Sequence, residues 1–254
     1  MIEAIQSLTL DASPEVSRGL GTVDARLRTF HQHLHNQIHQ RAQAASGRRL
    51  GIRCSLVPSS PMSVPREVLE DAMVEPQRRF SARLRSGEQI EAGLPIQVHN
   101  RRTILRGMRA YFHHEATSYN HEFFLDGTQN VTFVHRPPSA GSEAESDEVF
   151  TGWALGLTTG ALRIAATAAR ACSRPPEEFF VEVQICFAGG GDAAGRTVQR
   201  RLLDYRFDSI ATTFPRYSFR PDEGPIDVLN ALLADLYGSA GLKHTNRVVS
   251  IVPD

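Results

Sequence analysis

Residues 149–172 read VFTGWALGLTTGALRIAATAARAC, and the pattern of this stretch predicts a long helix. Its apolar positions recur at helical spacing, and the stripe comprises Trp153, Leu157, Ala161, Ile164 and Ala168. Gly152, Gly156 and Gly160 recur every four residues and leave a smooth ridge, which we expect to lie against a sheet because glycine lets another backbone approach closely. Pro175 and Pro176 end this helix.

A second helical stripe runs through the N-terminal part of the chain. It comprises Val16, Leu20, Val23, Leu27, Phe30, Leu34 and Ile38. Ser13 and Pro14 supply start signals, but Gly19 and Gly21 each weaken the helix by about 1 kcal/mol relative to alanine, so a start at Thr22 is the alternative. The stripe spans few heptads, which favours docking on its own domain over a coiled-coil seam.

The remaining elements follow from alternation and turn signals. Strands are expected at 51–57, 96–99, 103–114, 179–187, 200–207 and 214–219, a hairpin at 120–135 around Asp126-Gly127, a weak helix at 66–86 and a closing helix at 225–241. This order predicts an α+β fold, with long helices packed on a mainly antiparallel sheet. Residues 1–50 are expected to form an N-terminal helical segment and 51–254 an α+β domain, with a single domain as the alternative and a mobile acidic loop at 137–148.

Composition argues against export, membranes and a long-range electrostatic field. The 28 basic residues balance 28 acidic ones, and Lys243 is the only lysine. The N-terminus lacks a signal-peptide pattern, and the least polar stretch, 150–169, is interrupted by Arg163. The three cysteines, Cys54, Cys172 and Cys186, have no zinc or redox spacing. We therefore expect a cytoplasmic protein without a membrane partner.

Two motifs have a functional and a simpler interpretation. The string GGDAAGRT matches P-loop spacing at Gly190, Gly195, Arg196 and Thr197, but arginine replaces the lysine, and a glycine-rich connection between strands is favoured. The histidines at 31, 35 and 39 share one helix face, where a polar flank is favoured over a zinc site. No cofactor, metal or catalytic set is therefore predicted, although an enzyme or a nucleotide-binding protein that uses the glycine-rich loop at 189–197 stays the alternative function.

A basic segment is the best candidate binding site. It contains eight arginines against Glu88 and Glu91, for a net local charge of +6; these arginines are Arg78, Arg79, Arg83, Arg85, Arg101, Arg102, Arg106 and Arg109. Six of them are predicted to bind nucleic acid: Arg78, Arg79, Arg101, Arg102, Arg106 and Arg109. Tyr111 and Phe112 could stack on bases. The alternative is a set of charges that solubilises a strand edge.

The order of several segments resembles the C-terminal region of bacterial schlafen-like proteins with an AlbA-type domain. The matching segments are the N-terminal helix, GIRCSLVP, GWALGLTTGALRIAATAAR, EEFFVEVQI, FPRYSF and the terminal helix. The resemblance carries over no site residue, because that family's site lies upstream of the matching region. It implies an accessory or interaction role in a bacterial nucleic-acid-directed system such as phage defence. The preferred hypothesis is a non-enzymatic module that binds a protein partner or a second copy of the chain, nucleic acid, or both.

Overall fold

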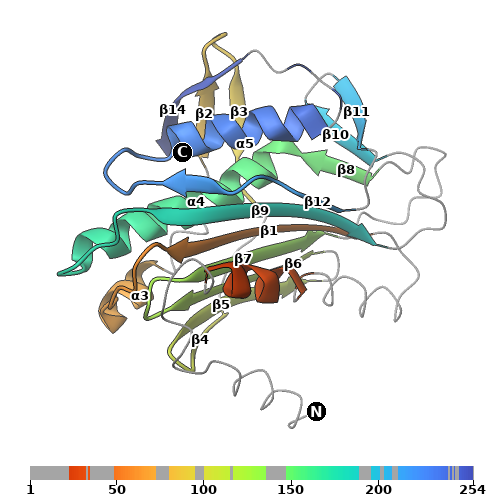
Figure 1. The fold of residues 1–254 in the computed structure, drawn as a ribbon. Helices are drawn as coiled ribbons and strands as arrows, with labels where there is room; N and C mark the ends of the chain where they lie inside the picture. Colours follow the sequence, from red (N-terminus) through yellow and green to blue (C-terminus); the bar gives the residue numbers. More distant parts are fainter. Residues whose placement is uncertain are drawn as a thin grey trace.

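An eight-stranded antiparallel sheet forms the centre of the molecule (Figure 1). The structure is a computed structural model that describes residues 23–32, 34, 49–72, 80–94, 100–114, 117–135, 147–188, 196–200, 203–207, 211–239, 241, 243 and 246–253. The strands lie in the order β12 (Ala211–Thr213), β9 (Phe179–Ala188), β1 (Arg49–Pro58), β7 (Gln129–His135), β6 (Thr117–Phe124), β5 (Gly107–His114) and β4 (Asn100–Ile104), and β13 (Tyr217–Phe219) also pairs with β9.

Two smaller sheets and three labelled helices complete the described fold. One sheet has the order β14 (Val248–Pro253), β2 (Phe80–Leu84) and β3 (Gln89–Ala92), and the other has the order β11 (Leu203–Phe207), β10 (Arg196–Arg200) and β8 (Asp147–Phe150). The helices are α3 (Arg66–Ala72), α4 (Thr151–Ala171) and α5 (Ile226–Ser239). Among the described strands only β8 and β10 pair in parallel. The predicted α+β class with a mainly antiparallel sheet is therefore confirmed.

Helix α4 holds the layers together. Its glycine ridge lies against the backbone of a sheet, as predicted. This sheet is the three-stranded sheet of β14, β2 and β3, called the small sheet below, and the ridge contacts β3 and the residues that follow it. A Cβ atom on Gly156 would lie 2.5 Å from the backbone nitrogen of Gly93, so only glycine fits there without a shift. Gly160 differs, because a Cβ atom at that position would meet no atom within 4 Å.

Successive side chains of β1 point to opposite faces of the large sheet. Ile52, Cys54 and Leu56 belong to the core that also contains α4. Arg53 points the other way, toward the helical residues 23–32, which lie across the sheet from α4 (Figure 1). Val23 and Leu27 of this helix are buried against Val57, so the predicted docking is confirmed for the described part of the helix. Its predicted start signals at Ser13 and Pro14 lie outside the described residues.

Three local predictions are wrong. The stretch 103–114 forms two strands rather than one, because Leu105 and Arg106 make a turn in which Arg106 adopts a φ of 58°. Within 66–86, residues 66–72 are helical, but Phe80–Leu84 forms strand β2, which pairs with the neighbouring β3 and with the distant β14. Asp147–Phe150 forms β8, so the last two residues of the predicted loop 137–148 belong to a strand, and the helix begins at Thr151, two residues later than predicted; residues 137–146 lie outside the described part of the chain.

Candidate nucleic-acid interface

The face of the large sheet that points away from α4 is polar. Because side chains alternate along each strand, the register places two cross-strand rows on this face. The first row contains Arg102, Arg109, Glu122, Asn130, Ser55 and Glu182. The second row contains Asn100, Tyr111, Asn120, Thr132, Arg53 and Gln184. A sheet face of this kind has polar groups to offer a ligand wherever nothing covers it.

One half of the polar face is covered and internally satisfied. Arg53 is fully buried and pairs with Glu182, and it donates to Gln184 Oε1 at 3.2 Å and to the carbonyl oxygen of Leu27 at 3.4 Å. Burial lowers the pKa of Arg53 more than the charge of Glu182 raises it. The Nε2 atoms of Gln184 and His31 lie 3.3 Å apart, so the helix of residues 23–32 is joined to the same network. This half of the face therefore holds the helix of residues 23–32 on the sheet and is not open to a ligand.

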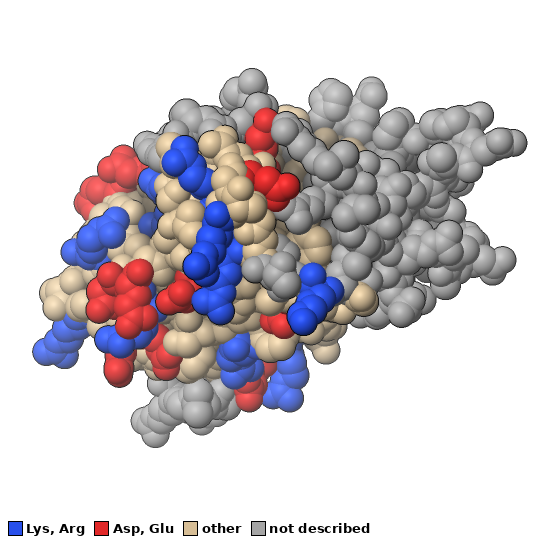
Figure 2. All heavy atoms as spheres, turned by 90° about the horizontal axis from the view of Figure 1, so that it is seen from above, with Lys and Arg blue, Asp and Glu red and all other residues tan. Residues whose placement is uncertain are grey.

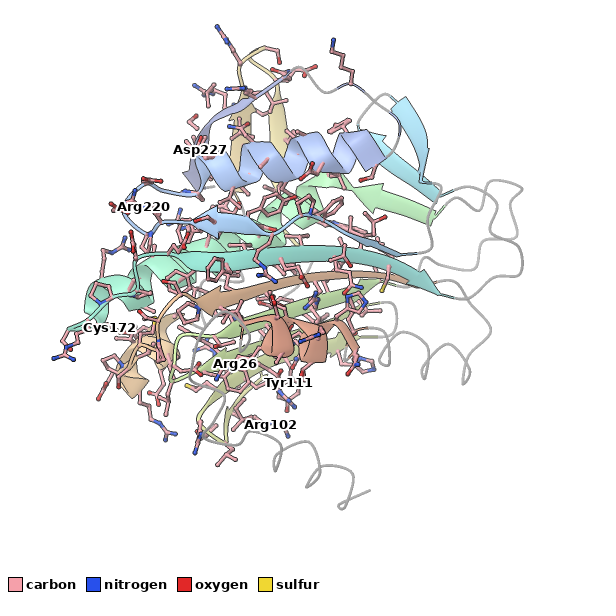
Figure 3. The ribbon with its side chains drawn as sticks, in the orientation of Figure 1. Arg26, Arg102, Tyr111, Cys172, Arg220 and Asp227 are labelled. Atoms are coloured by element: carbon pink, nitrogen blue, oxygen red, sulfur yellow. The ribbon has the colours of Figure 1, made fainter. Side chains whose placement is uncertain are left out.

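The other half opens into a hollow of about 270 Å³ on β4, β5, β6 and β7. It is lined by Arg102, Arg109, Tyr111, Phe112, His113, Ser118, Tyr119, Asn120 and Thr132. Arg102 is exposed, and its guanidinium carbon lies 5.7 Å from the centre of the Tyr111 ring. Figure 3 shows Arg102 and Tyr111 on the lower side of the large sheet, the side on which Arg26 lies. The hollow thus combines an arginine and an aromatic ring at one place.

The charge of the hollow comes mainly from Arg102. Arg109 forms an ion pair with Glu122, whose side chain is only 10% exposed, so two arginines against one glutamate leave one net positive charge. Arg26 also pairs with a carboxylate, that of Asp126, at 2.6 Å beside the β6–β7 turn. Arg102 has no carboxylate partner among the described residues. It is therefore the cation best placed to meet an anionic ligand.

The fold divides the basic segment that the sequence presents as continuous. Arg83 and Arg85 lie in and just after β2, in the small sheet, whereas the arginines at 101–109 belong to the β4–β5 hairpin. Seen from above, Lys and Arg are interspersed with Asp and Glu on the face near β2, β3 and β14 (Figure 2). A single face with the full charge of +6 is therefore not formed by the described arginines. Arg78 and Arg79 lie outside the described residues.

Within the β4–β5 hairpin, successive side chains point to opposite faces, so the predicted arginines do not all lie on the same face of the sheet. Arg102 and Arg109 pair across the strands on the polar face, while Arg101 pairs with buried Ala110 and points to the opposite face. Arg106 lies in the turn. Of the two aromatic candidates, Tyr111 lines the hollow with its ring, and Phe112 packs against the core.

Polar groups from β6 and β7 also line the hollow, and the sequence alone does not mark them as site residues. Asn120 and Ser118 are half-buried, and no side-chain hydrogen bond joins either to another described residue. Their signal was present in the strand SYNHEFF, where Ser118, Asn120 and Glu122 occupy alternate positions. It was not recognised because only the pairing of β6 with β5 shows that these residues lie beside Tyr111.

The alternative sites gain no support from the described residues. Arg196 and Thr197 lie in strand β10, whereas a P-loop needs a helix at that point; Gly190 and Gly195 lie outside the described part. His31 contacts Gln184 and Thr213, His35 and His39 are outside the described part, and no cluster of three metal-ligating side chains occurs within it. Burial raises the pKa of Cys54 to about 12, so this thiol is not a nucleophile at neutral pH.

No protein-family model matches the chain, and no curated protein matches it in sequence. The resemblance to schlafen-like proteins therefore stays a prediction. None of the helices in the described part of the chain has the length and apolar character needed to cross a bilayer.

Proposed function

We propose that this protein is a non-enzymatic module that binds nucleic acid at the hollow on β4, β5, β6 and β7. The observation that carries the proposal is the placement of the Arg102 guanidinium over the Tyr111 ring in an open, polar hollow of about 270 Å³. Arginine binds phosphate oxygens, and aromatic rings stack on bases, so the pair matches both parts of a nucleotide.

The arrangement of charge supports binding rather than catalysis. The hollow has an arginine that carries no carboxylate partner among the described residues, and its one acidic neighbour, Glu122, is already paired with Arg109. Arginine is not deprotonated in proteins and so is not an acid–base group, whereas a phosphate contact needs only its positive charge; His113 and Tyr111 are the titratable side chains that also line the hollow. The site is therefore equipped to hold an anionic ligand.

The experiment compares two adjacent arginines on opposite faces of β4. Arg102→Glu reverses the charge at the hollow, and we expect it to weaken binding of a labelled oligonucleotide at least about tenfold at about 50 mM salt. The slope of log K against log salt should also become shallower by about 0.7 to 0.9, the contribution of one phosphate contact. Fluorescence anisotropy at several salt concentrations measures both quantities.

Arg101→Glu is the matched control. It introduces the same charge change one residue away on the opposite face, so it should leave affinity within about twofold if the hollow is the site. Equal losses in the two variants would indicate a diffuse charge effect. Absence of salt-sensitive binding by the wild-type protein to DNA or RNA would overturn the proposed function.

The wider role rests on the resemblance described above. We propose that the protein acts in the bacterial cytoplasm, with a protein partner or a second copy of itself, in a nucleic-acid-directed system such as phage defence. A neighbouring gene that encodes a nuclease, a helicase or an AlbA-type protein would support this role. A neighbourhood of unrelated metabolic genes would count against it and would leave the binding experiment unaffected.

A further inference from the structure

The hollow has the features of a site for one unpaired base. We infer that it takes single-stranded nucleic acid, with a base stacked against Tyr111 and the base edge over Asn120; this inference rests on the proposed function. Tyr111 and Asn120 are directly opposed in the β5–β6 pair and lie on the same face of the sheet. Cβ atoms of directly opposed residues are about 5 Å apart, so both side chains can reach one base.

The polar atoms around Tyr111 match a base edge. The Asn120 amide offers two N–H donors and a carbonyl acceptor, and the nearby Ser118 hydroxyl both donates and accepts. Neither side chain has a hydrogen-bond partner among the described residues, so both are available to a ligand. Thr132 differs, because its hydroxyl donates to the carbonyl oxygen of Asn120 at 3.4 Å and so helps to fix the strand.

The shape of the surface disfavours a duplex. The major groove of DNA admits a protruding helix or a two-stranded ribbon. The β4–β5 hairpin is not free to act as such a ribbon, because β5 pairs with β6 from Gly107 to His114. A stacked base must also be unpaired, since the face of a paired base is covered by its neighbours. The hollow with its aromatic ring therefore suits a single strand.

The experiment measures anisotropy of a labelled single strand of about 12 nucleotides and of the same strand annealed to its complement. We expect the single strand to bind at least about tenfold more tightly than the duplex. Tyr111→Leu should weaken single-strand binding by about 5- to 150-fold, because it removes the stacking ring. Tyr111→Phe keeps the ring and should bind within about twofold of wild type.

A second variant keeps the test valid if Tyr111→Leu fails to fold. Asn120→Ala removes the partner for the base edge, lies on the same face and leaves the ring in place, and we expect a loss of about 3- to 10-fold in affinity. Circular dichroism and the fluorescence of Trp153, which packs against Phe133 in the core, report whether each variant is folded.

The outcomes separate the inference from the function on which it rests. If the duplex binds as tightly as the single strand, or if both Tyr111→Leu and Asn120→Ala bind like wild type while Arg102→Glu does not, the hollow binds phosphate without a base. The inference is then overturned and the proposed function stands. If neither nucleic acid binds in a salt-sensitive way, both are overturned.

Discussion

His121 shows how the two faces of one strand differ. It follows Asn120 in β6 and therefore points into the core, where it is fully buried. Its Nε2 atom lies 3.1 Å from Gln129 Oε1, and its Nδ1 atom has no hydrogen-bond partner within the described part of the chain. Burial is the larger effect on this imidazole and lowers its pKa to about 4, against the opposing effect of the hydrogen bond that its Nε2–H donates to Gln129. Histidine in this position stays neutral and is unsuited to proton transfer with solvent.

Acid should destabilise the protein through His121. The unfolded chain binds a proton near pH 6.5 and the folded chain only near pH 4, so the unfolded state holds more protons between these values. The stability that this group contributes is complete above pH 6.5 and is lost as the pH falls toward 4. We expect a loss of about 3 kcal/mol over this range, measured by urea unfolding at successive pH values.

His121→Gln is the variant that isolates this effect. The glutamine amide can donate to Gln129 and does not titrate, so the loss of stability between pH 6.5 and pH 4 should be much smaller. Burial also lowers the pKa of His135, but this contribution is present in both proteins, so the difference between wild type and variant reports His121. Asp126 acts at lower pH: burial raises its pKa, but Arg26 and Thr128 lower it further, to below its usual value. An unchanged pH dependence in the variant would contradict the assignment to His121.

Individual site residues could be predicted from the sequence only as members of a set. Arg102 and Tyr111 were both candidates, because arginines and aromatic residues close together are typical of nucleic-acid sites. Arg101 looked equivalent to Arg102, and Phe112 to Tyr111, until the turn at Leu105–Arg106 fixed which residues share a face. A one-residue change in register would have reversed both assignments.

At the scale of elements, α4 was the most predictable part of the chain. Its composition and its period of four indicated a buried helix with a smooth ridge, and the observed helix extends over Thr151–Ala171. Strands β3 and β14 were not predicted, because each is short and is stabilised by pairing with β2 rather than by local sequence. The contact of the glycine ridge with β3 could not be predicted either, because β3 itself was not predicted.

Two alanine substitutions in α4 should have opposite effects on stability. Gly160→Ala should raise the free energy of unfolding by about 1 kcal/mol, because alanine is the better helix former and its methyl group meets open space. Gly156→Ala should lower it by about 1 to 3 kcal/mol, since the methyl group would overlap the backbone of Gly93 and Ala92. Thermal and urea unfolding of the two variants measure the difference, and a similar effect of both would show that the ridge is not in close contact with the small sheet.

At the scale of the whole molecule, one apolar core connects the elements. The same buried cluster contains Phe133 of the large sheet, Leu155 of α4, Phe80 of the small sheet and Leu233 of α5. Residues far apart in sequence therefore share a core, which composition and periodicity cannot reveal because they describe local segments. The fold class was predictable from the elements, whereas the assignment of strands to separate sheets depended on these long-range contacts.

A shared core should unfold as one unit. Trp153 is the only tryptophan and packs 5.2 Å from Phe133, between ring centres, at the contact of α4 with the large sheet. Its fluorescence and the far-ultraviolet circular dichroism should change at the same urea concentration, because loss of α4 removes apolar contacts from both the large and the small sheet. Gly156→Ala weakens only the contact with the small sheet directly, yet it should shift both signals equally. Separate transitions, or a shift confined to one signal, would show that the small sheet and the large sheet are independent folding units.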